Sequence, residues 1–261
     1  MAAAFAGAGV GALGGLIGLG GAEFRLPLLV GVFSIPLRRA IGLNLGVSLV
    51  TVLAALSGRL AAGAPESPAP LHVIGALMGG GVAGAYLGAS WLIGASSDAL
   101  WRGVRGLLAM IGVLLLTEAF VPWGSGGLVA GPIAQSSVGV VAGVLIGIVS
   151  SLLGVAGGEL IIPTLVFGFG VDIKAAGTAS LMISVPTVLV GLWRQASSGL
   201  RPSAGELTGL VLPMSAGSIV GAVIGAMLVA FVPGSSLKAV LGLVLILSAA
   251  RLRGHAPTAG T

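Results

Sequence analysis

A glycine-rich, charged interruption of apolar sequence occurs twice in this chain, 136 residues apart. Residues 18–27 read Gly-Leu-Gly-Gly-Ala-Glu-Phe-Arg-Leu-Pro, and residues 154–163 read Gly-Val-Ala-Gly-Gly-Glu-Leu-Ile-Ile-Pro. Over residues 18–58 the same offset gives 14 identities in 41 positions without a gap, whereas a chain of this composition would match itself at about one position in ten. The two stretches therefore belong to an internal repeat, and the fold must accommodate both.

The sequence around these stretches is that of an integral membrane protein. The 261 residues are 56% hydrophobic and only 7% charged, with a mean hydropathy of +1.16, whereas about a quarter of a soluble domain is charged. The long apolar runs predict helices rather than the short alternating strands of a barrel. The net charge of +5 does not indicate a nucleic-acid partner, because Lys and Arg lie singly or in pairs between apolar runs.

Ten apolar segments are expected, in two sets of five. The first repeat covers residues 1–121 and the second 134–252, joined by a linker at 122–133 and followed by a disordered tail at 253–261. The segments are 3–20, 24–35, 40–58, 71–94, 100–121, 134–153, 159–169, 174–194, 205–231 and 236–252. We therefore expect an all-α polytopic membrane protein with one membrane domain.

The second segment of each half is too short to cross a hydrocarbon core, which needs about 20 residues. Segments 24–35 and 159–169 either dip in and out of the membrane or fold back along the preceding helix as a hairpin. In both cases a broken or re-entrant pair is followed by three spanning helices. Each half then makes an odd number of crossings, so the sequence predicts two inverted-topology repeats.

The positions of the basic residues favour this arrangement, with both termini in the cytoplasm of a cell whose inner membrane holds the protein. The side of the termini collects Arg38, Arg39, Arg102, Arg105, Arg194, Arg201, Arg251 and Arg253, against Arg59, Lys174 and Lys238 on the other. Cytoplasmic loops are the ones enriched in Lys and Arg. Treating the short segments as loops beyond a spanning first helix divides the charges more evenly.

Glycines recur at intervals of four in the fourth segment of each half. They are Gly80, Gly84 and Gly88, then Gly217, Gly221 and Gly225. This spacing leaves a smooth helix face, which predicts close packing against another helix.

The two glycine breaks are the first candidates for a binding site. A half-helix that begins inside the membrane presents free N–H groups and a partial positive charge, which suit an anion. The small residues there would let the backbone reach a ligand: Gly20, Gly21, Ala22, Gly157 and Gly158. The alternative is a tight helix corner that binds nothing.

A polar stripe follows each break. Asn44, Ser48 and Thr51 occupy the same repeat positions as Ser180, Ser184 and Thr187. Within each stripe the last two residues lie on nearly one helix face, with the first a turn earlier. Such stripes either line a solute path or bond to neighbouring helices, and both interpretations stay open.

Glu23 and Glu159 are equivalent acids that we expect at membrane depth, where ionisable groups are costly and often functional. They are candidates for proton coupling, and the alternative is a neutral acid that caps the short helix. Arg25 has no counterpart, because Ile161 stands at its repeat position. It could pair with Glu23 or attract an anion, but we expect it to extend to the membrane interface.

The sequence predicts neither a metal site nor an enzyme. The chain has no cysteine, and its two histidines, His72 and His255, lack partners at metal-ligand spacing. No nucleophile and base form a pair within the apolar segments. We therefore expect no cofactor.

These residues resemble the TauE/SafE family of sulfite exporters, also called the toluene-sulfonate uptake permease family. The resemblance covers nearly the whole chain, with Ala156 standing where the motif has a glycine. It is carried by Gly18, Gly20, Gly21, Pro27, Ala40 and Asn44, then by Gly154, Gly157, Gly158, Pro163, Ala176, Thr178 and Ser180.

The resemblance implies a multi-pass permease or exporter of small anions such as sulfite, sulfonates or other organosulfur compounds. Its partners would be the anion, the lipid bilayer and, as a coupling ion, the proton; a homo-oligomer stays open. The alternative is a membrane scaffold or assembly protein whose helix breaks are only structural.

Overall fold

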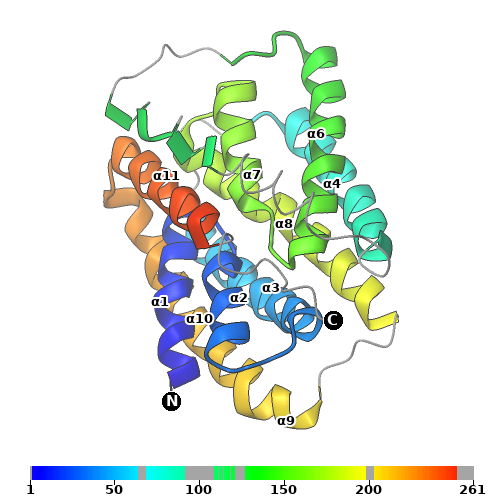
Figure 1. Ribbon diagram of the computed structural model, residues 1–261. Coiled ribbons are helices and arrows are strands. Elements are labelled where there is room, and N and C mark those ends of the chain that lie inside the picture. Colours follow the sequence, from blue (N-terminus) through cyan, green and yellow to red (C-terminus); the bar gives the residue numbers. More distant parts are fainter. Residues whose placement is uncertain are drawn as a thin grey trace.

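The computed structural model describes residues 2–63, 69–91, 109–110, 112–113, 115–117, 119–120, 127–197 and 203–251. The first half contains α1 (Ala2–Ile17), α2 (Ala22–Gly31), α3 (Leu37–Ala61) and α4 (Leu71–Trp91) (Figure 1). The second half contains α6 (Pro132–Leu153), α7 (Gly158–Pro163), α8 (Ile173–Ser197), α9 (Ala204–Glu206), α10 (Leu212–Leu228) and α11 (Gly234–Arg251). Two π-helical turns, η1 (Thr164–Gly168) and η2 (Leu207–Val211), and a 3-10 turn, η3 (Val229–Phe231), extend α7, α9 and α10.

The expected all-α polytopic architecture is confirmed in the described part of the chain, which contains helices and no strand. Five helical stretches are long and apolar enough to cross a membrane: Arg39–Ala61, Leu71–Ser90, Pro132–Leu152, Ile173–Ser197 and Ala204–Phe231. Most of the predicted segment 100–121, the linker residues 122–126 and the tail at 253–261 lie outside the described residues.

Each glycine break folds the chain back on itself, so the short segments form hairpins with the helices before them. In the second hairpin, the N–H groups of Leu128 and Val129 donate to the carbonyls of Phe167 and Gly168 at 3.1 and 3.0 Å. In the first, Ala3 shares a buried cluster with Leu29. In Figure 1 α1 rises from the N-terminus at the bottom of the view, whereas α6 descends from the top.

Long helices of the two halves pack against each other along the predicted glycine faces. Helix α1 packs on α10, and α6 packs on α4. The two lines of glycines, Gly80, Gly84 and Gly88 on α4 and Gly217, Gly221 and Gly225 on α10, are called the glycine seams. A Cβ atom added to any of these six glycines would overlap a carbonyl oxygen of the facing helix. The oxygens belong to Val140, Val144 and Ile148 for Gly80, Gly84 and Gly88, and to Ala4, Ala8 and Ala12 for Gly217, Gly221 and Gly225. Close packing is thus confirmed, and the contacted residues in α6 lie 136 positions after those in α1.

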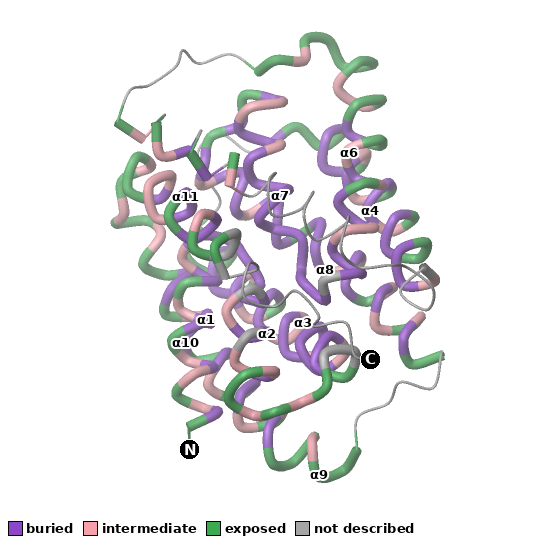
Figure 2. The backbone as a smooth tube through the Cα atoms, viewed as in Figure 1, coloured by how far each residue is buried: buried purple, intermediate pink, exposed green. Residues whose placement is uncertain are grey.

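Helices α3 and α8 form the centre of the molecule. Within the most apolar window of each span, 67% of the α8 residues and 56% of the α3 residues are buried, against 28% for α6 (Figure 2). The exposed positions of α6 and α10 carry apolar side chains such as Val141, Leu145, Val220 and Ile224. Apolar side chains on an outward face suit a lipid environment.

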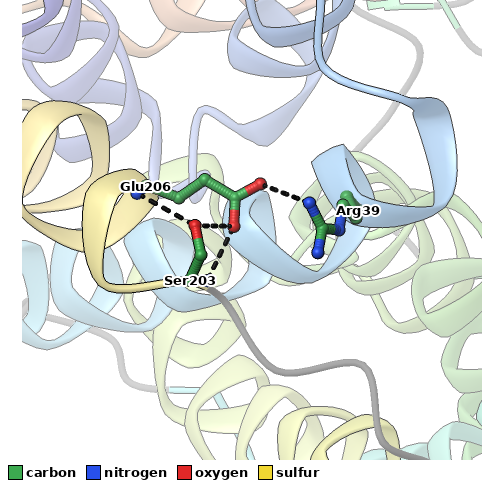
Figure 3. Close-up of polar contacts among 3 residues, drawn as sticks. All are labelled: Arg39, Ser203 and Glu206. Atoms are coloured by element: carbon green, nitrogen blue, oxygen red, sulfur yellow. Dashed lines mark hydrogen bonds and ion pairs between the residues drawn. The ribbon is translucent and has the colours of Figure 1, made fainter.

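An exposed polar cluster joins the start of α3 to the start of α9 (Figure 3). Ser203 and Glu206 form a capping box, in which the Ser203 N–H donates to the Glu206 carboxylate at 2.7 Å. Arg39 Nη1 lies 3.3 Å from the same carboxylate. Because exposed ion pairs add little free energy, this pair aligns two helix ends rather than holding the fold together.

The glycine seam predicts that replacement by alanine has different effects on stability at two glycines of α4, Gly84 and Gly79. Gly84→Ala puts a methyl group onto the Val144 carbonyl, whereas Gly79 has no described atom within 4 Å of an added Cβ. We expect Gly84→Ala to lower the free energy of unfolding by about 1–3 kcal/mol, as overpacking does, and Gly79→Ala to leave it unchanged. Thermal unfolding in detergent measures both, and equal melting temperatures for the two variants would contradict the seam.

Candidate functional site

The two glycine breaks lie against each other in the interior of the protein. Gly18 and Gly21 have φ angles of +96° and +66°, and their counterparts Gly154 and Gly157 have +68° and +82°. Such left-handed angles are ordinary for glycine and strained for other residues, so glycine at these positions is a conformational requirement. A Cβ on Gly20 would lie 2.7 Å from the Cβ of Ala156, which shows that the breaks touch.

Each break also packs on the central helix of the other half. An added Cβ at Gly18 would lie 2.5 Å from the backbone of Gly177 in α8, and one at Gly154 would lie 2.9 Å from the backbone of Ile41 in α3. Ile41 and Gly177 occupy the same position in the two repeats. The contact is therefore reciprocal, and it places the polar stripes of α3 and α8 beside the breaks.

Asn44 connects the two breaks directly. Its Nδ2 donates to the Ala22 carbonyl at 2.9 Å and to the Gly154 carbonyl at 3.0 Å, and the side chain is fully buried. The Gly154 carbonyl, freed by the end of α6, needs such a donor in a low-dielectric interior, whereas the Ala22 carbonyl begins α2 and gains Asn44 as a second donor. One side chain of the first stripe thus holds backbone from both halves.

Arg25 is the most highly connected side chain of the site, and the expectation that it extends to the membrane interface is wrong. Its exposed fraction is 0%. Nε donates to Asn44 Oδ1 at 3.3 Å, and Nη1 donates to Thr51 Oγ1 at 2.7 Å and Ser218 Oγ at 3.3 Å. Nη2 donates to Ser48 Oγ at 2.9 Å and to the Gly20 carbonyl. These partners lie deep in the protein, so the guanidinium turns inward.

In the second half, the stripe hydroxyls that form hydrogen bonds donate to backbone carbonyls. Ser184 Oγ donates to the Ala156 carbonyl at 2.8 Å, and Thr187 Oγ1 donates to the Ile183 carbonyl of its own helix at 2.8 Å. Ser180 Oγ is buried with no hydrogen-bond partner among the described atoms. Ile161, at the position of Arg25, is 1% exposed and lies in the main apolar cluster. The two threonines bond alike, since Thr51 Oγ1 donates to the Val47 carbonyl at 2.7 Å, but the other stripe positions differ in their bonding.

The breaks and both stripes are buried, as a site at membrane depth requires. Gly20, Gly21, Ala22, Gly157 and Gly158 are all buried, as are the six stripe residues. Glu159 is buried in the first turn of α7, with a 4% exposed fraction. Glu23 lies in α2, and its side chain is outside the described part of the chain. The roles of these residues in binding and proton coupling stay predictions.

Arg59 is a second buried arginine, which the sequence reading treated only as a charge at a helix end. It donates to the carbonyls of Gly15, Leu16 and Lys174 at 3.2, 2.8 and 3.0 Å, and to Thr178 Oγ1 at 3.2 Å. It thereby caps the end of α1 and joins it to the start of α8. Its repeat counterpart Gln195 is also buried, and neither polar atom of its side chain has a described partner.

The arrangement supplies a positive charge and hydroxyl groups next to irregular backbone. A guanidinium with hydroxyl neighbours is a recognition group for oxoanions. Within the described residues, no three His, Asp or Glu side chains cluster as a metal site would require.

The bonding of Asn44 predicts that its loss destabilises the protein more than loss of its repeat counterpart. Asn44→Ala removes the donor to the Gly154 carbonyl and the additional bond to the Ala22 carbonyl, and a buried unsatisfied group costs about 1–3 kcal/mol. Ser180→Ala removes a hydroxyl with no described partner, so we expect little change. Melting temperatures of the two purified variants check this, and a larger loss for Ser180→Ala would contradict it.

Comparison with known proteins agrees with the geometry. Residues 139–257, which run from within α6 to beyond the end of α11, match the family model described as "Sulfite exporter TauE/SafE". The chain is 24% identical over 240 residues to "Probable membrane transporter protein YdhB" of Bacillus subtilis strain 168, covering 89% of this chain and 94% of that protein. No solved structure matches the chain significantly. The second half of the chain is thus similar to the TauE/SafE family, as the paired glycine motifs indicated, and the chain as a whole is similar to a probable membrane transporter.

Proposed function

We propose that this protein is a secondary transporter of small anions such as sulfite, sulfonates or other organosulfur compounds. The observation that carries the proposal is the meeting of the two glycine breaks, with Gly20 against Ala156, beside a buried guanidinium. The family description names sulfite export, which supports the substrate class. Ionisable groups inside a membrane are costly and often functional, so the buried charge favours a binding site over a purely structural corner.

In the proposed binding mode the anion lies between the breaks, near the membrane midplane. The breaks would contribute backbone N–H groups at Gly20, Gly21, Ala22, Gly157 and Gly158, since freed N–H groups at helix starts attract anions. The polar stripes would contribute Asn44, Ser48, Thr51, Ser180, Ser184 and Thr187. The burial of all these residues supports one enclosed site.

We further propose that the halves are inverted repeats that rock against each other, with both termini in the cytoplasm and the protein in the cell's inner membrane. The reciprocal contacts of Gly18 with Gly177 and of Gly154 with Ile41 support a two-fold relation between the halves. The opposite directions of α1 and α6 in Figure 1 support the inversion. Transporters built in this way bind substrate at the interface of their repeats.

Proton coupling is the proposed role of Glu159 or Glu23. Glu159 is buried beside the second break, at a depth where a carboxyl group can exchange a proton as its surroundings change. Only one of the two acids needs to do so, because the copies of an inverted repeat face different solvents.

Uptake by proteoliposomes tests the transport proposal. Purified protein in vesicles should take up radiolabelled sulfite with saturation, and unlabelled methanesulfonate should compete, since both present oxygens to the same donors. Empty vesicles are the control. Uptake no faster than in empty vesicles for both anions would favour the scaffold alternative.

Glu159→Gln tests coupling, because it keeps the shape of the side chain but removes its ability to exchange a proton. If Glu159 carries the coupling proton, the variant should still exchange sulfite across the membrane at equal pH. It should also lose the acceleration of net uptake by a pH gradient. Glu23→Gln is the matched variant in the other half, and full acceleration in both would remove the acids from the coupling mechanism.

A further inference from the structure

We propose that the hydroxyl groups of Ser150 and Ser180 donate hydrogen bonds to the oxygens of the transported anion at the second glycine break. The assignment of Ser150 is new, since the sequence predicted no role for it and neither the family match nor the relative assigns one. The inference rests on the proposed function and names the side chains of the second half that receive the anion.

Both hydroxyls are buried and lack a hydrogen-bond partner. Ser150 is 2% exposed and Ser180 is 0% exposed, and neither Oγ atom has a partner among the described atoms. The large majority of buried polar side-chain atoms in proteins are hydrogen-bonded, so each exception requires an explanation. Two exceptions beside one helix break indicate that a partner from outside the chain belongs there.

The helices that carry these residues do not prevent the hydroxyls from bonding. A serine or threonine inside a helix can donate to the carbonyl four residues before it. In α6, Ser137 forms this bond at 3.0 Å, and in α8, Thr187 forms it at 2.8 Å. Ser150 and Ser180 lie within the same two helices, but their hydroxyls do not form this bond. The two side chains are therefore directed elsewhere.

Each hydroxyl lies against a glycine of the second break. A Cβ atom added to Gly157 would overlap Ser150 Oγ, and one added to Gly158 would lie 3.0 Å from Ser180 Oγ. The two glycines are consecutive, so both hydroxyls face the same short piece of irregular backbone. Because glycine has no side chain, nothing from these two positions covers the hydroxyls.

The first half shows that a break of this kind forms without such hydroxyls. Its glycines have the same left-handed angles, but Gly14 stands at the repeat position of Ser150, and Asn44 stands at that of Ser180. Gly14 has no side chain to bond, and Asn44 Nδ2 already donates to two carbonyls. The unpartnered hydroxyls are thus a property of the second break, which indicates a function there rather than a requirement of the fold.

The hydroxyls suit the oxygens of a sulfite or sulfonate group. A hydroxyl can rotate its hydrogen toward an acceptor, and hydrogen bonds to charged oxygens are about twice as strong as those between neutral groups. The anion would supply the acceptor that each hydroxyl lacks. Glu159 directly follows Gly158. Its proposed role is to take up a proton, and a protonated carboxyl group would not repel the anion.

Ser150→Ala and Ser180→Ala test the inference by uptake of radiolabelled sulfite into proteoliposomes and by the shift in melting temperature that sulfite produces. Each variant loses one hydrogen bond to a charged group, so we expect about a tenfold higher KM and a smaller shift at the same sulfite concentration. Without sulfite, neither variant should melt below the unaltered protein, because the lost hydroxyl was buried without a partner. Lower affinity without lower stability distinguishes binding from packing.

Ser151→Ala is the matched control, since Ser151 adjoins Ser150 and is also 2% exposed, but donates to the Ala85 carbonyl at 2.9 Å. We expect this variant to keep the KM and the sulfite-induced shift, with a slightly lower melting temperature. A KM within twofold of the unaltered protein in either test variant would overturn the inference, and ordered water as the partner of the hydroxyls predicts that result. An equal rise in KM for Ser151→Ala would also overturn it.

The unaltered protein separates this inference from the proposed function. If it shows neither uptake nor a sulfite-induced shift, the proposed function fails, and this inference fails with it. If it shows both and only the serine variants differ from expectation, this inference alone fails.

Discussion

Backbone groups that lose their helical partners inside a membrane are the constraint on which this structure depends. At both breaks, the first freed N–H groups turn back to the preceding helix: Gly18 and Leu19 donate to the Gly14 carbonyl, as Val155 donates to that of Ser150 at the equivalent position. The freed carbonyls need donors from elsewhere. Asn44 donates to the Gly154 carbonyl, Ser184 to that of Ala156, Arg25 to that of Gly20, and Arg59 to those of Gly15 and Leu16. Because lipid offers no hydrogen bonds, these side chains are what makes a broken helix tolerable at that depth.

Such donors reach the breaks only because the helices of the two halves approach closely. Glycines on α4 and α10 bring α6 and α1 into backbone contact, and the main apolar cluster combines Ile17 and Leu19 of the first half with Ile162 and Leu165 of the second. The main described core is thus shared between the halves, so the interface between them is also part of the protein interior.

The repeat explains which features the sequence could predict. Helix positions, the breaks at Gly18–Ala22 and Gly154–Gly158 and the glycine seams follow from hydropathy and from a pattern that occurs twice. Hydrogen bonds between residues of different halves leave no such pattern in the sequence. Arg25 bonds to Ser218, 193 residues away, and Asn44 bonds to Gly154, 110 residues away. Without those partners, an arginine ten residues from the end of an apolar segment is expected to reach water. Its burial depends on hydrogen-bond partners that come together only in the folded chain.

The two copies of the repeat are unequal in charge at the positions that matter most. The second half has Ile161 and Gln195 at the repeat positions of Arg25 and Arg59. All four side chains are buried. In the described part of the chain, both buried arginines therefore belong to the first half, and through Arg59 that half also bonds to the Lys174 carbonyl and Thr178 of the other. A charge moves with the helix that carries it. If the halves rock as proposed, the positive charge would shift relative to the second break, and the two orientations of the protein would differ in electrostatic potential.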